Sequence, residues 1–283
     1  MNRTARRIGF IFLCTLPFLD IAVVGVRALR IPGVYQAIGG VLFAAIVIAA
    51  WILGARVIGS GAAGGRRLAL AGALLILPFA IISLLWVGLG APFEATTPEN
   101  YMRFLVLLAN AIVVASAFVA LKEELYDAGE PFYSTVGFAA SIPAGAAYLV
   151  CISMSVARSV VAMRGEATSS LDSLGEFYSV LEFVACVLTY VTTAAFATSL
   201  GRARWLGRGA ARAYVMASAV LLLFLVTRGL SYPEISGNTP PWYTRPGVIA
   251  GIPAIPWIMP CLLGVVLLRR AGDEHRVTVS EIA

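Results

Sequence analysis

The chain has 283 residues, of which 60% are hydrophobic and 13% are charged, and its mean hydropathy is +0.88. Soluble domains contain about 25% charged residues, so the composition excludes a soluble enzyme. The formal net charge is +6. In so apolar a chain, a basic excess indicates segments that flank a membrane and excludes a nucleic-acid-binding domain.

Long apolar segments recur along the whole chain and are separated by short connections. A membrane-spanning helix needs about 20 mostly apolar residues, and eight segments meet this requirement. They cover residues 8–29, 33–58, 68–90, 101–121, 134–157, 177–200, 211–230 and 248–268. Pro253, Pro256 and Pro260 interrupt the last segment, so seven spans are the alternative. The predicted fold class is all-α: a polytopic transmembrane helix bundle that occupies residues 1–283 as a single domain.

The distribution of Lys and Arg predicts the orientation of this bundle. With the N-terminus in the cytoplasm, most of the 21 basic residues fall in connections on the cytoplasmic side. An even number of spans then places both termini in the cytoplasm. The connection at residues 122–133 is an exception, because several acidic residues accompany its single lysine.

Several site classes are excluded by residues that the spans lack. The only histidine, His275, lies in the C-terminal tail, so the spans contain no bis-histidine haem site and no histidine zinc site. Residues 59–64 match G-x-G-x-x-G, but spans flank the motif where a dinucleotide-binding fold needs a strand. We therefore expect a turn there, and we expect neither a metal nor a cofactor.

Asp20 lies deep inside the first predicted span. A carboxyl group in hydrocarbon is costly, so it usually lines a cavity, pairs with a cation or takes part in chemistry. The alternative is a structural role, in which Asp20 pairs with an arginine or bonds to backbone that Pro17 leaves free.

Glu182 belongs to a second intramembrane polar pattern. Polar side chains recur around it at intervals of three and four residues, which places them on one helical face. They are Tyr178, Glu182, Cys186, Thr189 and Thr193. Such a face points into the bundle or into a wet cavity. Hydrogen bonding between helices is the structural alternative.

Other polar and aromatic side chains are predicted in the same outer half of the spans. Arg158 ends the fifth span, Arg228 ends the seventh, and Asn110 lies in the middle of the fourth. Each arginine alone could extend to the membrane interface. Together with the two acids they predict a polar pocket in the outer leaflet. The candidate substrate-binding residues are Arg228, Arg158, Asn110, Tyr178 and Trp257.

In size, in number of spans and in its lack of a soluble domain, the chain resembles small integral membrane proteins of fungal biosynthetic clusters, among them membrane-bound terpene cyclases. The resemblance implies a metal-independent cyclase or isomerase acting on a lipophilic isoprenoid. Asp20 and Glu182 would be the catalytic acids that protonate an epoxide or alkene. Aromatic side chains would stabilise the resulting carbocation.

Two other functions fit the same residues. Intramembrane acids and proline-containing helices also suit a small-molecule or proton-coupled transporter. A membrane receptor or structural partner protein is the third hypothesis, although short connections leave little surface for docking. The lipid bilayer is the expected partner in every case, no nucleic acid is expected, and no pattern indicates an oligomeric state.

Overall fold

The fold is an all-helical bundle, seen in a computed structural model that describes residues 3–24, 33–59, 63–90, 95–230 and 254–282. The side chains of residues 20–24, 63–64, 172, 176, 179, 228–230, 254–257 and 275–282 lie outside this description. The helices are α1 (Arg3–Val24), α2 (Val34–Leu53), η1 (Ala55–Gly59), α3 (Ala63–Leu89), α4 (Thr97–Asp127), α5 (Pro131–Met163), α6 (Ser169–Asp172), α7 (Gly175–Arg202), α8 (Arg208–Leu230) and α10 (Ala254–Ile282).

Six of these helices are long and apolar enough to cross a membrane, so the protein is a multi-pass integral membrane protein. They are Val34–Leu53, Gly65–Leu89, Thr97–Asp127, Pro131–Met163, Val180–Arg202 and Arg208–Thr227. The first and last predicted spans extend into residues 25–29 and 248–253, which lie outside the described residues. The total of eight spans therefore stays a prediction.

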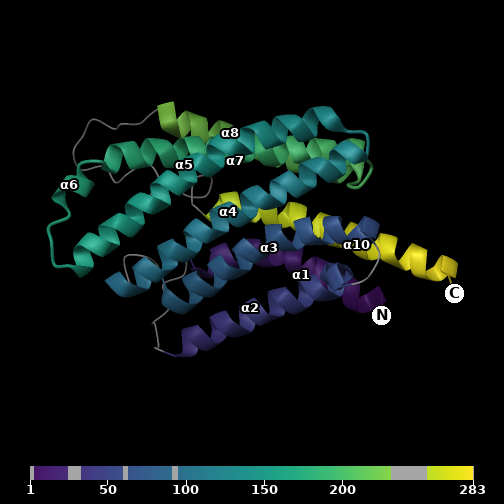
Figure 1. Cartoon of the computed structure of the whole chain (residues 1–283), viewed down its shortest axis with the longest axis horizontal. Helices are drawn as coiled ribbons and strands as arrows, with labels where there is room; N and C mark the ends of the chain where they lie inside the picture. The colour runs from purple at the N-terminus through teal and green to yellow at the C-terminus, as the bar shows by residue number, and fades with distance from the viewer. Residues whose placement is uncertain (1–2, 25–32, 60–62, 91–94, 231–253, 283) are drawn as a thin grey trace.

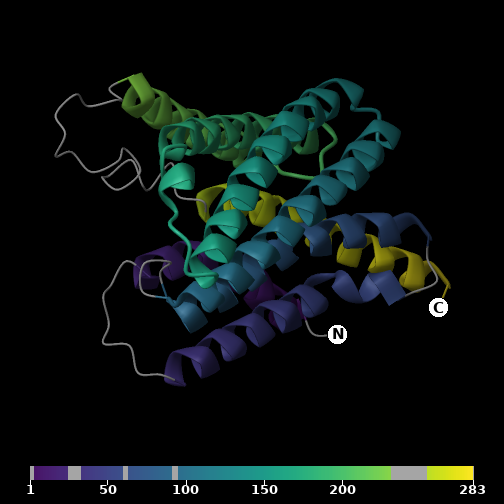
Figure 2. The same ribbon diagram turned by 60° about the vertical axis from the view of Figure 1, so that its left-hand side comes forward.

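The helices form two groups joined by shared neighbours (Figures 1 and 2). On one side α8 packs on α7, α7 on α5, and α5 on α4. On the other side α1 packs on α2, and both α2 and α10 pack on α3. Contacts of α3 with α4 and of α10 with α7 join the groups. Helix α1 begins and α10 ends at the same end of the bundle (Figure 1). Which side of the membrane that end faces stays a prediction.

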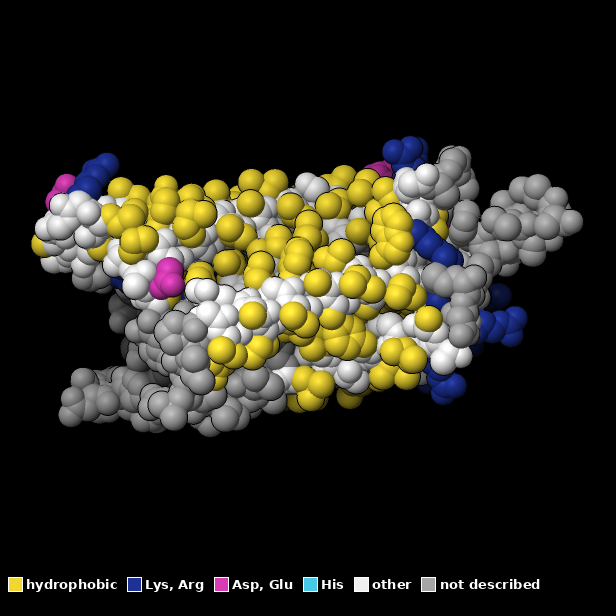
Figure 3. All heavy atoms as spheres, turned by 90° about the horizontal axis from the view of Figure 1, so that it is seen from below, with side chains coloured by type: hydrophobic (Ala, Val, Ile, Leu, Met, Phe, Trp, Pro, Cys, Tyr) yellow, Lys and Arg dark blue, Asp and Glu magenta, His cyan; other side chains and the backbone are white. Residues whose placement is uncertain are grey.

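The surface agrees with a membrane environment. On the face in Figure 3, hydrophobic side chains cover the middle and charged side chains lie towards the two ends. Large apolar side chains on several helices point outwards, including Val41, Ile112, Ile142 and Val220. In a bilayer these side chains would contact lipid, which is favourable, whereas in water their exposure would be unfavourable.

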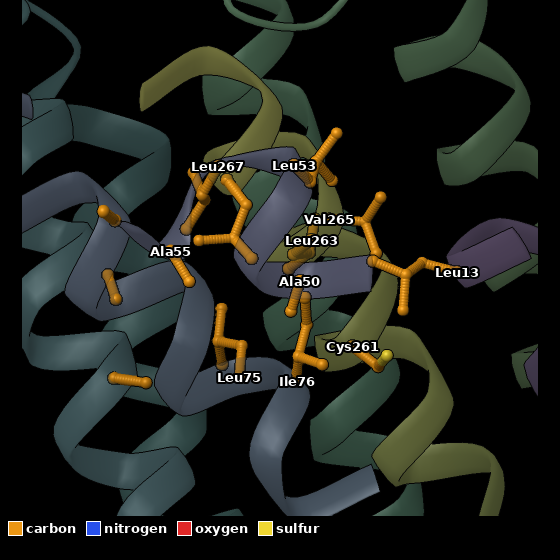
Figure 4. Close-up of a cluster of buried hydrophobic side chains, with 14 of the residues drawn as sticks. Leu13, Ala50, Leu53, Ala55, Leu75, Ile76, Cys261, Leu263, Val265 and Leu267 are labelled. Atoms are coloured by element: carbon orange, nitrogen blue, oxygen red, sulfur yellow. The ribbon is translucent and has the colours of Figure 1, made fainter. Parts of the chain in front are cut away.

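The largest apolar core lies among α1, α2, α3 and α10 (Figure 4). Leu13, Leu53, Leu75 and Leu267 meet there from the four helices. Two glycines let α3 approach α10. A Cβ added at Gly264 would lie 2.7 Å from the Gly72 carbonyl oxygen, so no larger residue fits without moving backbone.

Two predicted boundaries were wrong. The segment 33–58 does not form one helix: α2 ends at Leu53, and Gly54 packs against the backbone of α10 at Leu268. The predicted connection at 122–133 is mostly helical, because its Glu and Lys residues favour helix once it has started. Only residues 128–130 join α4 to α5, with Gly129 at a φ of 81°.

Candidate functional site

Glu182 lies near the start of α7, at the interface with α5, and only 6% of its surface is exposed. The predicted polar face of α7 is therefore turned into the protein. Cys186, Thr189 and Thr193 follow Glu182 on this face and are also buried. Helix α5 contributes the opposing side of the site.

Two residues of α5 lie beside Glu182. The Tyr148 hydroxyl group and Cys186 Sγ are 3.7 Å apart, and Cys151 Sγ donates to the backbone oxygen of Tyr178 at 3.7 Å. Glu182 is close enough to Tyr148, Cys151 and Cys186 to interact electrostatically with each of them. Among the described residues, the carboxyl group is thus surrounded by weak donors and acceptors, and none of these contacts is with a cation.

No hydrogen bond or ion pair joins Glu182 to another residue in the part of the chain that the structure describes. An ionised carboxylate without a partner is very costly in a low dielectric, and the neutral form is favoured there. Glu182 is therefore suited to hold a proton in the resting protein and to exchange it when a base or water approaches.

A cavity of about 40 Å³ lies next to this cluster. It lies among α4, α5, α7 and α10 and is lined by Ala111, Val114, Ala115, Phe118, Ser141, Ala144, Gly145, Tyr148, Thr189, Thr192 and Pro260. Tyr148 belongs to both the cavity wall and the surroundings of Glu182. One water needs about 10–15 Å³ of such space, so the cavity accommodates a few waters.

Polar side chains follow one another along α7, from the cavity wall towards the end of the helix. The hydroxyl groups of Thr189 and Thr193 donate to backbone oxygens one turn earlier, at 2.7 and 2.8 Å. In contrast, Thr192 Oγ1 and Ser199 Oγ are buried and make no hydrogen bond to the described protein. Buried hydroxyl groups are normally paired, so these two mark where water or a polar ligand atom is most stabilising.

The other predicted site residues that the structure describes lie in different surroundings. Arg158 is exposed in the last third of α5. Asn110 is buried, and its Nδ2 donates to the Pro78 carbonyl oxygen on α3 at 3.4 Å. Tyr178 contributes its backbone oxygen to the Cys151 contact.

The side chains of Asp20, Arg228 and Trp257 lie outside the described residues. Their backbones are in α1, α8 and α10. Helix α1 packs mainly on α2 and α10, whereas α7 packs mainly on α5 and α8. Asp20 and Glu182 therefore belong to different groups of helices, and their joint action stays a prediction.

Arg103 is an intramembrane arginine that contacts a carbonyl group and an aromatic ring. It is fully buried, its Nη2 donates to the Gly90 carbonyl oxygen at 2.6 Å, and its guanidinium group lies 5.0 Å from the Trp86 ring centroid. The cation–π contact and the carbonyl acceptor both stabilise the buried guanidinium group. The short connection between α3 and α4 places Trp86 and Arg103 near each other, and this sequence signal could have indicated their contact.

Sequence reasoning missed Ser141 and Thr192 as members of the site. Thr192 lies in the same helix as Glu182, but only the packing of α4 and α10 shows that it faces a cavity. The described residues include no group of three or more His, Cys, Asp or Glu able to hold a metal ion. Comparison of the chain with models of known protein families, with curated proteins and with solved structures found no match.

Proposed function

We propose that this membrane protein transfers protons across the membrane through Glu182. The observation that carries the proposal is a buried carboxyl group with no hydrogen-bond or ion-pair partner among the described residues. A protonated acid inside a membrane is characteristic of proton relays.

The size and lining of the adjacent cavity favour proton transfer. Sites for small molecules usually measure about 300–1,000 Å³. The cavity beside Glu182 is about 40 Å³, and its mostly apolar lining includes Ser141, Tyr148, Thr189 and Thr192. Water in such a space would link Glu182 to Thr192, and Ser199 extends the row of polar groups towards the end of the bundle where α7 ends.

The test is proton movement into lipid vesicles that contain the purified protein. A pH gradient is imposed, and an enclosed pH-sensitive dye reports proton entry. We expect entry faster than in protein-free vesicles, and we expect Glu182→Gln to abolish the difference. Glu166→Gln is the matched control, because Glu166 is exposed in the connection after α5. Equal proton entry in the Glu182→Gln and unaltered proteins would overturn the proposal.

Acid-catalysed cyclisation of an isoprenoid is the second candidate, and one observation favours it. The rings of Tyr148 and Tyr190 lie in the same buried cluster as Glu182, where they could stabilise a carbocation formed by protonation of an epoxide or alkene. The proton would leave the Glu182 carboxyl group and would return when a carbon of the product loses its proton. An isoprenoid would require α4, α5, α7 and α10 to separate around the cavity.

A second experiment separates these candidates. The purified protein is mixed in detergent with an epoxidised isoprenoid, and products are identified by mass spectrometry. A cyclase needs no pH gradient, so it turns over in detergent and loses turnover in Glu182→Gln. Absence of cyclised product together with gradient-driven proton entry favours transport, and the reverse pair of results favours the cyclase.

A further inference from the structure

An open groove of about 750 Å³ lies at the end of the bundle where α7 and α8 meet. It is separate from the Glu182 cluster, which lies near the other end of α7 (Figure 1). The groove is lined by Gly129, Glu130, Thr198, Gly201, Arg202, Arg204, Arg208, Ala211, Arg212, Val215 and Met216. Its wall therefore combines a set of arginines with an apolar strip.

The charge of the groove is strongly positive. Arg202 Nε donates to Glu130 Oε2 at 2.7 Å, so this pair is internally neutral. Arg204, Arg208 and Arg212 pair with no carboxylate in the described part of the chain. Three guanidinium groups are therefore free to bind an anion, and their planar donors match the oxygen geometry of a phosphate.

Arg204 lies in the turn between α7 and α8, whereas Arg208 and Arg212 lie in the first turns of α8. Trp205 and Leu206 pack against the main apolar core, which anchors the middle of the turn. Arg204 has a φ of 62°, a left-handed conformation that costs free energy for residues other than glycine.

The apolar strip continues from the groove along α8. Met216, Val220 and Leu223 are 63%, 60% and 65% exposed, and their spacing places them on one face of the helix. A soluble anion would gain nothing from this face. A molecule with a phosphate at one end and an acyl chain at the other would contact both parts.

We infer that the arginine groove binds the phosphate headgroup of an anionic phospholipid, whose acyl chain lies along the exposed face of α8. Clusters of Lys and Arg next to a membrane span attract anionic headgroups in general. The groove adds a defined cavity, and α8 adds a continuous apolar path. This inference does not depend on the role of Glu182.

The experiment measures lipid binding to the full chain in detergent by native mass spectrometry. The probes are phosphatidylglycerol, phosphatidylcholine, glycerol phosphate and inorganic phosphate. We expect tighter binding of phosphatidylglycerol than of phosphatidylcholine, and little competition from glycerol phosphate or inorganic phosphate. The double variant Arg208→Gln/Arg212→Gln should weaken binding of phosphatidylglycerol by about tenfold or more.

Arg66→Gln/Arg67→Gln is the matched control, because it removes two exposed arginines near the start of α3 and leaves the groove intact. It should change the affinity less than twofold. Arg208→Lys/Arg212→Lys keeps the charge and should retain most of the binding, which separates loss of charge from misfolding. Equal affinity in the Gln variant and the control would overturn the inference. Full competition by inorganic phosphate would contradict the lipid as ligand and would indicate that the groove binds a soluble anion.

Discussion

The packing of α3 on α10 and the packing of α7 on α5 differ in chemistry. Of the most apolar part of α3, 61% is buried inside the protein, and its contact with α10 depends on Gly72 and Gly264 lying backbone to backbone. The contact of α7 with α5 instead buries Glu182, Tyr148 and two cysteines. The α3–α10 pair therefore stabilises the bundle by close packing of apolar surfaces, whereas the α7–α5 pair keeps buried polar groups that close packing does not require.

The largest loss of stability is expected from Gly264→Leu. The added side chain would collide with the Gly72 carbonyl oxygen and with Leu75, so α3 and α10 must separate. We expect the free energy of unfolding to fall by about 3 kcal/mol or more. Thermal unfolding in detergent measures the change. The control is Gly40→Leu in α2, where an added Cβ contacts nothing within 4 Å, and equal destabilisation by both variants would contradict the role given to Gly264.

A smaller loss is expected from Arg6→Ala. Arg6 Nη1 forms a 2.6 Å ion pair with Asp273 Oδ1, and Nη2 donates to the backbone oxygens of Leu53 and Arg269 at 3.1 and 3.0 Å. Removing it leaves carbonyl groups unpaired where α1, α2 and α10 meet, so the free energy of unfolding should fall by about 2 kcal/mol. Denaturant titration provides the measurement. Arg7→Ala is the control because Arg7 is exposed.

The sequence predicts the helices better than the contacts between them, for a physical reason. A long apolar segment predicts a membrane-spanning helix from its own composition. The predicted span 177–200, for example, closely matches α7 (Gly175–Arg202). The inward face of α7 was also predictable from the spacing of its polar residues. The partner on α5 was not predictable, because several apolar helices could cover the same face. Arg103 shows the same limit: its Trp86 partner depends on the register between α3 and α4.

Two buried serines sharpen the contrast between packing and polar function. Ser199 Oγ and Ser134 Oγ are both fully buried. Ser134 donates to the Glu130 carbonyl oxygen at 2.8 Å, whereas Ser199 has no hydrogen-bond partner among the described residues. Ser199→Ala should raise the free energy of unfolding by about 1 kcal/mol, because it removes an unpaired hydroxyl group. Ser134→Ala should lower it by a similar amount. Thermal unfolding measures both, and destabilisation by Ser199→Ala would show that Ser199 has a partner.

Ser199→Ala also tests whether the Ser199 hydroxyl group lowers stability but contributes to proton transfer. If the hydroxyl groups along α7 conduct protons from Glu182, the more stable variant should admit protons into vesicles several times more slowly. Stabilising substitutions at functional sites commonly reduce activity. Unchanged proton entry would limit the conducting groups to Glu182 and the cavity.

The smallest change in stability is expected from Glu182→Gln. If the carboxyl group is protonated in the resting protein, glutamine replaces it with a neutral group of nearly the same shape, and the free energy of unfolding should change by less than about 1 kcal/mol. If Glu182 is instead ionised and paired, the substitution removes one partner of a buried ion pair, which typically costs about 3–5 kcal/mol. Glu182→Ala is a useful comparison, because it should destabilise the contact of α7 with α5 by loss of packing in either case. Thermal unfolding of the two variants therefore distinguishes a proton donor from a structural ion pair without any knowledge of the substrate.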